Sequence, residues 1–177
     1  MANIIDTINE IGEEVRNTLQ TENSSLYFQE TSLLYSLAEN LLKYLVATKK
    51  CWDINCQLVD ELEAKKAHGK IVSDEEYYFD GEKVRNQIKK IRFVDAIDSA
   101  HSLGLITKDL RDRLDVFRQE RNSLIHELYL FHERNNEKLM KQRLINAEAI
   151  VSELVPVFEN LIFNEIGVDI DEVLETL

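Results

Sequence analysis

The sequence contains few of the residues that break helices. It has one proline and five glycines in 177 residues, so helices have few places where they must end. Leucine, isoleucine, glutamate, lysine and asparagine are abundant instead. This composition predicts an all-α protein, and the length is sufficient for one domain with a substantial hydrophobic core.

Long apolar runs are also absent. None approaches the roughly 18 residues that a membrane span needs. The acidic N-terminus lacks the basic and then apolar segments of a signal peptide. We therefore expect a cytoplasmic protein with no membrane association.

Cysteine is scarce, and no pattern for a metal or cofactor is present. Cys51 and Cys56 have no second cysteine pair or nearby histidine to complete a zinc site, so we expect two buried, reduced thiols. The chain has no P-loop, glycine-rich dinucleotide turn, calcium loop or DNA-reading signature. The sequence thus predicts no metal, no cofactor and no DNA-specific recognition.

Positive charge is in deficit overall but concentrated locally. A net charge of −12 argues against a protein that coats nucleic acid nonspecifically. Residues 107–143 nevertheless hold nine Lys and Arg against seven Asp and Glu, whereas the other 140 residues hold 12 against 26. A local basic surface fits a small contact with RNA or nucleotide, and it equally fits an ordinary solvated helix face.

Apolar periodicity predicts an antiparallel bundle of about five to six helices. The expected helices cover about 2–20, 23–49, 53–67, 83–103, 107–132 and 134–165. Residues 1–165 would form a single domain with a long connection near 69–82, and 166–177 an acidic C-terminal tail or short helix. Tyr77, Tyr78 and Phe79 in the connection can stack on bases or anchor the loop to the core.

Residues that typically cap or break helices support several of these boundaries. Asn23-Ser24-Ser25, Asp53 and Thr107 offer capping chemistry for the second, third and fifth helices. Gly69 can end the third helix, and Pro156 is expected to kink the last one.

A charged residue interrupts the apolar stripe of the helix at 107–132. The stripe has steps of three and four, with one member missing at position 121. Its apolar members are Leu110, Leu114, Phe117, Leu124, Leu128 and Phe131. Arg121 takes the missing place, and a guanidinium there costs several kcal/mol unless it is paired or lines a polar cavity. Asn122 and His126 lie one turn apart on the neighbouring face.

The run Arg121-Asn122-Ser123-Leu124-Ile125-His126 resembles the signature of the HEPN superfamily, R-x4-6-H with a polar residue after the arginine. The resemblance covers residues 92–132, including the lead-in 103–110. It implies a homodimer with the motifs at the two-fold interface and metal-independent RNA cleavage.

The three motif residues can divide the chemistry of such cleavage. His126, with an ordinary pKa near ~6.5, can act as acid or base. Arg121 can grip two phosphate oxygens, and Asn122 can orient the imidazole or bind phosphate. One histidine per chain leaves the complementary acid or base unsupplied, and a dimer would provide it. Arg121 and His126 lie about 140° apart on an ideal helix, so arginine length, a bend or the partner must close that gap.

Two further residues are candidates for substrate contact, Arg118 and Tyr129. One HEPN branch, partnered by a nucleotidyltransferase antitoxin, extends the motif to R-x4-H-x-Y, and the tyrosine accepts AMP. Here Leu128 stands at that place and Tyr129 one position later. This departure affects the antitoxin partner and leaves the other motif residues unchanged.

We therefore expect a metal-independent endoribonuclease of a toxin–antitoxin or phage-defence system. The alternatives are a catalytically silent HEPN-like domain that binds nucleotide, RNA or protein, and a helical adaptor without a small ligand. In the alternatives, Arg121 pairs with a carboxylate such as Glu120 or one from another helix, and His126 is an ordinary helix histidine.

Overall fold

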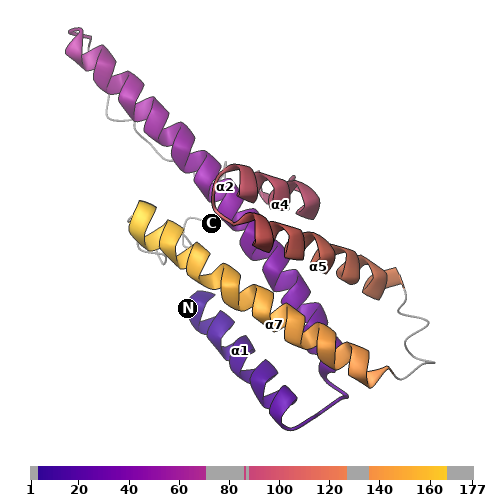
Figure 1. Ribbon diagram of the computed structural model, residues 1–177. Helices are drawn as coiled ribbons and strands as arrows, with labels where there is room; N and C mark the ends of the chain where they lie inside the picture. The colour runs from indigo at the N-terminus through magenta and orange to yellow at the C-terminus, as the bar shows by residue number, and fades with distance from the viewer. Residues whose placement is uncertain (1–3, 71–85, 87, 127–135, 167–177) are drawn as a thin grey trace.

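The computed structural model describes residues 4–70, 86, 88–126 and 136–166, and in these ranges the chain is all-α. It forms a bundle of long helices (Figure 1), which confirms the predicted fold class. The described elements are α1 (Ile4–Gln20), α2 (Tyr27–Ala67), α4 (Phe93–Ser102), α5 (Lys108–His126), α7 (Glu137–Glu159) and a π-helix, η2 (Asn160–Ile166).

Helix α2 is the spine of the molecule. It runs for 41 residues without a break, so the predicted boundary at Asp53 is wrong. Asp53 lies inside the helix and forms an ion pair with Lys49, at 3.1 Å. An (i, i+4) pair of this kind stabilises a continuing helix, and a residue suited to capping does not end a helix by itself. The helix ends at Ala67, and Gly69 just beyond it has a φ of +77°, as predicted for a helix stop.

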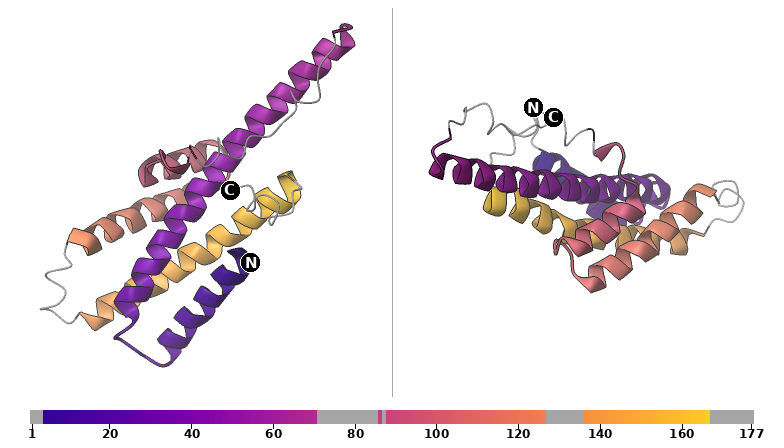
Figure 2. Two further views of the ribbon diagram at one scale, coloured as in Figure 1. Left: turned by 180° about the vertical axis from the view of Figure 1, so that it is seen from behind. Right: turned by 90° about the horizontal axis from the view of Figure 1, so that it is seen from above.

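The other helices pack along α2. Helices α4 and α5 lie along one flank of α2 and helices α7 and α1 along another, and α5 and α7 meet through Arg113 and Glu153. The far end of α2 extends beyond these four helices (Figures 1 and 2). Helices α2 and α7 run in the same direction, and α1 and α5 run against them. The distal half of α2 therefore projects from the bundle, and its proximal half passes beside α5.

The described part of the apolar stripe of α5 faces the core, as predicted, while its last two members, Leu128 and Phe131, lie outside the described residues. Leu110, Leu114, Phe117 and Leu124 are all at most 5% exposed. The ring of Phe117 packs edge-on against Tyr35 of α2, with centroids 4.4 Å apart. This packing fixes the rotation of α5 about its axis, and position 121 thereby faces α2.

Two predicted caps have opposite outcomes. The Thr107 hydroxyl accepts a hydrogen bond from the Leu110 amide at 3.2 Å, which confirms it as the cap of α5. The prediction for Asn23-Ser24-Ser25 is wrong, because α2 begins after Leu26 with no side-chain cap. The Ser25 hydroxyl donates to the Asn23 side chain instead, at 2.6 Å. These polar groups bond to each other within the turn.

The C-terminal helix continues past its proline. Pro156 lies inside α7, which ends at Glu159 and passes into the π-helix η2. Asn136 caps the start of α7 by accepting from the Leu139 amide at 3.4 Å. The predicted kink at Pro156 stays a prediction.

The remaining sequence predictions concern cysteines, membranes and segments outside the described ranges. Cys51 is buried, but Cys56 is exposed, so the prediction of two buried thiols is wrong for Cys56; both are free. No described helix has the length and apolarity to cross a membrane. The segments 71–85 and 167–177 lie outside the described residues, and with them the aromatic cluster 77–79 and the predicted C-terminal tail.

Candidate functional site

The side chain of Arg121 reaches α2 from the C-terminal half of α5. Its Nη2 lies 3.0 Å from Oε2 of Glu39, and its Nη1 donates to Oδ1 of Asn122 at 3.4 Å. The side chain is 33% exposed, although Phe117 and Leu124 on the same stripe are each 2% exposed. The Arg121 guanidinium therefore lies at the edge of the α2–α5 interface, outside the apolar core, where it forms an ion pair with Glu39.

Glu39 binds a second cation on its own helix. Its Oε1 lies 2.5 Å from Nζ of Lys43, one turn further along α2. Both side chains are mostly buried, with 14% of Glu39 and 18% of Lys43 exposed. Two cations thus share one carboxylate, one on each oxygen. We call Glu39, Lys43 and Arg121 the shared-carboxylate triad; its formal charge is +1.

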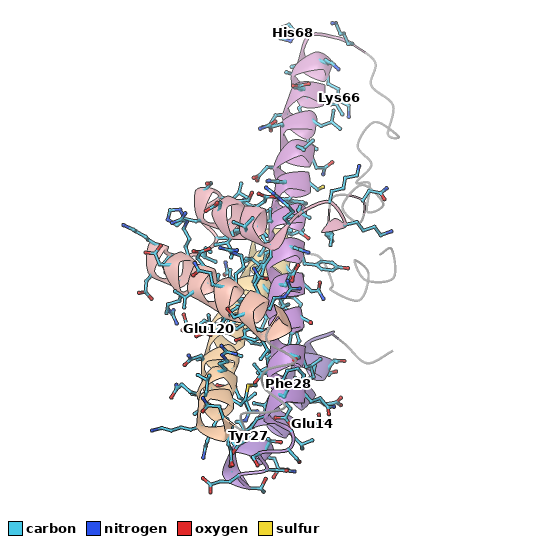
Figure 3. All side chains as sticks on the ribbon, turned by 90° about the vertical axis from the view of Figure 1, so that its right-hand side faces the viewer. Glu14, Tyr27, Phe28, Lys66, His68 and Glu120 are labelled. Carbon is cyan, nitrogen blue, oxygen red and sulfur yellow. The ribbon has the colours of Figure 1, made fainter. Side chains whose placement is uncertain are left out.

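A second polar pair lies next to the triad. The Tyr35 hydroxyl donates to Oε2 of Glu120 at 3.4 Å. Burial raises the pKa of this hydroxyl, the Glu120 carboxylate raises it further, and Arg143 of α7 acts in the opposite direction. Along α2, Glu120 lies between the levels of Tyr27 and His68 and closer to Tyr27 (Figure 3). The polar contacts between α2 and α5 therefore involve the first part of α2, at Tyr35 and Glu39.

These contacts decide which carboxylate holds Arg121. Glu120, the neighbour named from the sequence, bonds to Tyr35, and Glu39 of α2 takes its place beside Arg121. Arg121 is therefore paired with a carboxylate from another helix, as the structural interpretation of this residue expects. That pairing does not by itself exclude a role in binding.

Of the predicted motif, the structure describes the contact between Arg121 and Asn122. His126 is the last residue of α5, and its side chain lies outside the described residues, as does all of Tyr129. The convergence of the imidazole on Arg121 therefore stays a prediction. Asn122 is half-buried and holds the guanidinium in position.

Arg118 is bound locally. Its Nε and Nη2 donate to Oδ1 of Asp115 at 3.0 and 2.8 Å. The hydrogen bond from Arg118 lowers the pKa of the Asp115 carboxyl below its usual value. The pair lies within a single turn, and one quarter of the Arg118 side chain is exposed. Its substrate contact stays a prediction.

The other arginines of α5 have carboxylates of their own. Arg111 pairs with Asp98 and Asp112. Arg113 pairs with Asp109 and Glu153, and hydrogen bonding to Glu153 raises the pKa of its guanidinium. The basic region found in the sequence is therefore largely neutralised along the first half of the helix. Among the described cations of α5, Arg121 differs because its carboxylate is shared.

Sequence reasoning missed Glu39 and Lys43. Their signal is a charged pair at (i, i+4) spacing inside a strongly apolar helix segment, where the buried neighbours include Ala38, Leu41 and Leu42. Charged side chains flanked by buried positions usually indicate pairing or a polar site. The spacing alone does not show that the pair meets Arg121, because that contact joins positions 82 residues apart.

No group of three or more His, Cys, Asp or Glu side chains within the described ranges has the arrangement of a metal site. Comparison of the chain with known proteins found no matching family model, no matching curated protein and no matching solved structure.

Proposed function

We propose that this chain is a metal-independent endoribonuclease of a toxin–antitoxin or phage-defence type. Its site would consist of Arg121, Asn122 and His126 from each subunit of a homodimer, brought together at the two-fold axis. The proposal is supported by the resemblance of these residues to the HEPN motif. It is also supported by their position on a single helix, α5, of an all-α bundle.

One observation carries the proposal. Arg121 occupies a core-facing position between buried Phe117 and Leu124, yet its side chain is one-third exposed and oriented by contacts with Glu39 and Asn122. A guanidinium held in place beforehand loses little conformational entropy when it binds a phosphate. The two described contacts use one donor on Nη1 and one on Nη2, out of five N–H donors in the group.

The residues would act together at one phosphodiester. One His126 imidazole would remove the proton of the ribose 2′-hydroxyl, and the imidazole of the other subunit would protonate the leaving 5′ oxygen. Arg121 would stabilise the additional negative charge on the phosphorane through hydrogen bonds to its non-bridging oxygens. Asn122 would keep the guanidinium in the orientation that this contact requires.

The test is cleavage of labelled RNA in excess EDTA by the purified chain. His126→Ala and Arg121→Ala are each expected to abolish cleavage, and any growth inhibition on expression, with helical content and subunit mass unchanged. His101→Ala and Arg92→Ala are matched controls, because His101 is exposed and Arg92 is 77% exposed and, among the described residues, pairs with Asp95 alone. Cleavage that survives Arg121→Ala would contradict the proposal.

The second candidate is a catalytically silent HEPN-like domain that binds RNA, nucleotide or protein. The contact with Glu39 favours it, because Arg121 already contacts a carboxylate of its own chain and a substrate has to compete with that group. Wild-type protein that binds RNA through Arg121 and cleaves none would establish this alternative. A nucleotidyltransferase-type antitoxin belongs to the first proposal, and its target would be Tyr129.

A further inference from the structure

We propose that Lys43 is a second phosphate-binding cation beside Arg121, and that a phosphate of single-stranded RNA displaces the Glu39 carboxylate that holds both cations. This inference rests on the proposed function in taking RNA as the ligand. It goes beyond it by adding a residue on α2 to a site otherwise built on α5.

The geometry of the triad carries the first step. Lys43 Nζ contacts one oxygen of Glu39, and Arg121 Nη2 contacts the other, at 2.5 and 3.0 Å. Two cations from different helices thus converge on a group with two acceptor oxygens. The non-bridging oxygens of a phosphodiester offer the same kind of acceptor pair to a guanidinium and an ammonium. A phosphate in this place would contact both cations together.

Charge and burial carry the second step. The three side chains are between 14% and 33% exposed, so water shields them only in part. Within the triad, one carboxylate balances the charge of one of the two cations. The remaining positive charge of the triad is partly desolvated and favours binding of an anion. Glu120 is directed to the Tyr35 hydroxyl. A phosphodiester brings the single negative charge that compensates the excess.

Glu39 has a positioning role in this scheme. In the absence of ligand, its carboxylate keeps Lys43 and Arg121 close together despite their mutual repulsion. A phosphate must displace this carboxylate from at least one cation, so Glu39 lowers the affinity for RNA. Neutralising Glu39 should therefore strengthen binding, provided that the two cations stay in place.

The experiment measures binding to a probe that cannot be cleaved. Fluorescence anisotropy with a fluorescein-labelled 2′-O-methyl oligouridylate gives the affinity of each full-length variant. Lys43→Gln is expected to weaken binding about tenfold, as is Arg121→Gln, because each loses a charge-assisted contact with phosphate. Lys43→Arg should restore most of the affinity, and Glu39→Gln should strengthen binding about threefold or more, since the internal competitor is gone.

Lys49 provides the matched control. It lies on the same helix, is 21% exposed and forms an (i, i+4) ion pair with Asp53, but it also contacts Glu165 and not Arg121. Lys49→Gln removes the same charge and is expected to leave affinity within about twofold of wild type. The salt dependence gives a second readout, because losing one contact with single-stranded RNA lowers the slope of log K against log salt by about 0.7. Lys43→Gln should show this change and Lys49→Gln should not.

The outcomes separate this inference from the proposed function. Equal affinities for Lys43→Gln and Lys49→Gln, with both variants folded by circular dichroism, would overturn the inference, as would weaker binding by Glu39→Gln. Cleavage that needs Arg121 and His126 but not Lys43 would leave the ribonuclease proposal intact. Binding that needs Lys43 without cleavage of unmodified RNA would support the inference and contradict the ribonuclease. Wild-type protein that binds no probe at tens of micromolar contradicts the inference directly.

Discussion

The two halves of α5 treat the same residue type differently. In the first half, Arg111 and Arg113 each contact two carboxylates. In the second half, Arg121 contacts one carboxylate among the described residues, and it shares this carboxylate with Lys43. A count of charges along the sequence makes these arginines look equivalent. The contacts show that Arg111 and Arg113 have carboxylates of their own, whereas Arg121 shares its carboxylate with a second cation.

This difference suggests a criterion for sorting surface arginines. An exposed guanidinium with its own carboxylates contributes little to stability and offers little attraction to an anion. A partly buried guanidinium that shares its carboxylate with another cation retains charge where the solvent screens it less. The second half of α5 is therefore the better place for a phosphate, and the following predictions test that contrast.

The largest expected effect is on cleavage. Arg121→Lys is expected to lower cleavage of labelled RNA by about 100-fold, because lysine keeps the charge but not the planar fork. Arg113→Lys should leave the rate unchanged, since its contacts are with Asp109 and Glu153. Single-turnover assays would show the difference. Equal rates for the two variants would mean that the halves of α5 do not differ in function.

A large effect on the free energy of unfolding is also expected for a substitution in the apolar stripe of α5. Leu114 is fully buried, so Leu114→Ala should lower the free energy of unfolding by about 2–5 kcal/mol. Arg121→Leu should change it by less than about 1 kcal/mol, because leucine suits the stripe and Glu39 keeps Lys43 as a partner. Urea denaturation gives both values. A loss of about 3–5 kcal/mol for Arg121→Leu would identify a structural ion pair.

Subunit mass tests whether the second half of α5 meets a partner. We expect a dimer through the motif helix at micromolar concentration, because one His126 per chain leaves the reaction without its complementary acid or base. Sedimentation equilibrium gives the mass. A strict monomer at tens of micromolar would contradict the site composed from two subunits. The second half of α5 would then have no catalytic role of the kind proposed.

The smallest expected effect is on the pH dependence of stability. The hydrogen bond from Arg113 holds the pKa of Glu153 below its ordinary value, so this pair stabilises the fold above that value. The contribution is lost as the pH falls through the lowered pKa of the folded state. It should amount to less than about 0.5 kcal/mol, because both side chains are over 40% exposed. Urea midpoints of Arg113→Gln and wild type should therefore converge at acidic pH, and a constant difference would contradict the pairing.

Local patterns predicted the parts of the fold that depend on local physics. The stripe of α5 and its Thr107 cap follow from helical periodicity and from the orphan amides of a helix start. The predicted helix start at Asp53 is wrong, because a residue suited to capping also suits an ion pair with Lys49 one turn away. Which of these applies depends on whether the preceding residues stay helical, and their burial in the tertiary structure decides that.

The candidate site was predictable only on one of its two helices. The break at Arg121 is visible in α5 alone, as is the adjacent Asn122. The partner Glu39 belongs to α2, and its contact depends on how the two helices pack around Phe117 and Tyr35. Before packing is known, every carboxylate within reach of a helix surface is an equal candidate. The motif thus located the cation, and the arrangement of helices identified its counterion.

Because α2 is continuous, a label on it can report distances between two copies of the molecule. Cys56 is exposed on its projecting part, while Cys51 is buried, so a nitroxide or fluorophore can be attached there without engineering. The label would lie 17 residues from Glu39 along a straight helix, about 26 Å at 1.5 Å per residue. In an assembly that joins two copies through α5, the separation of the labels would report the angle between the two spines. Pulsed electron resonance could then follow that angle with and without RNA.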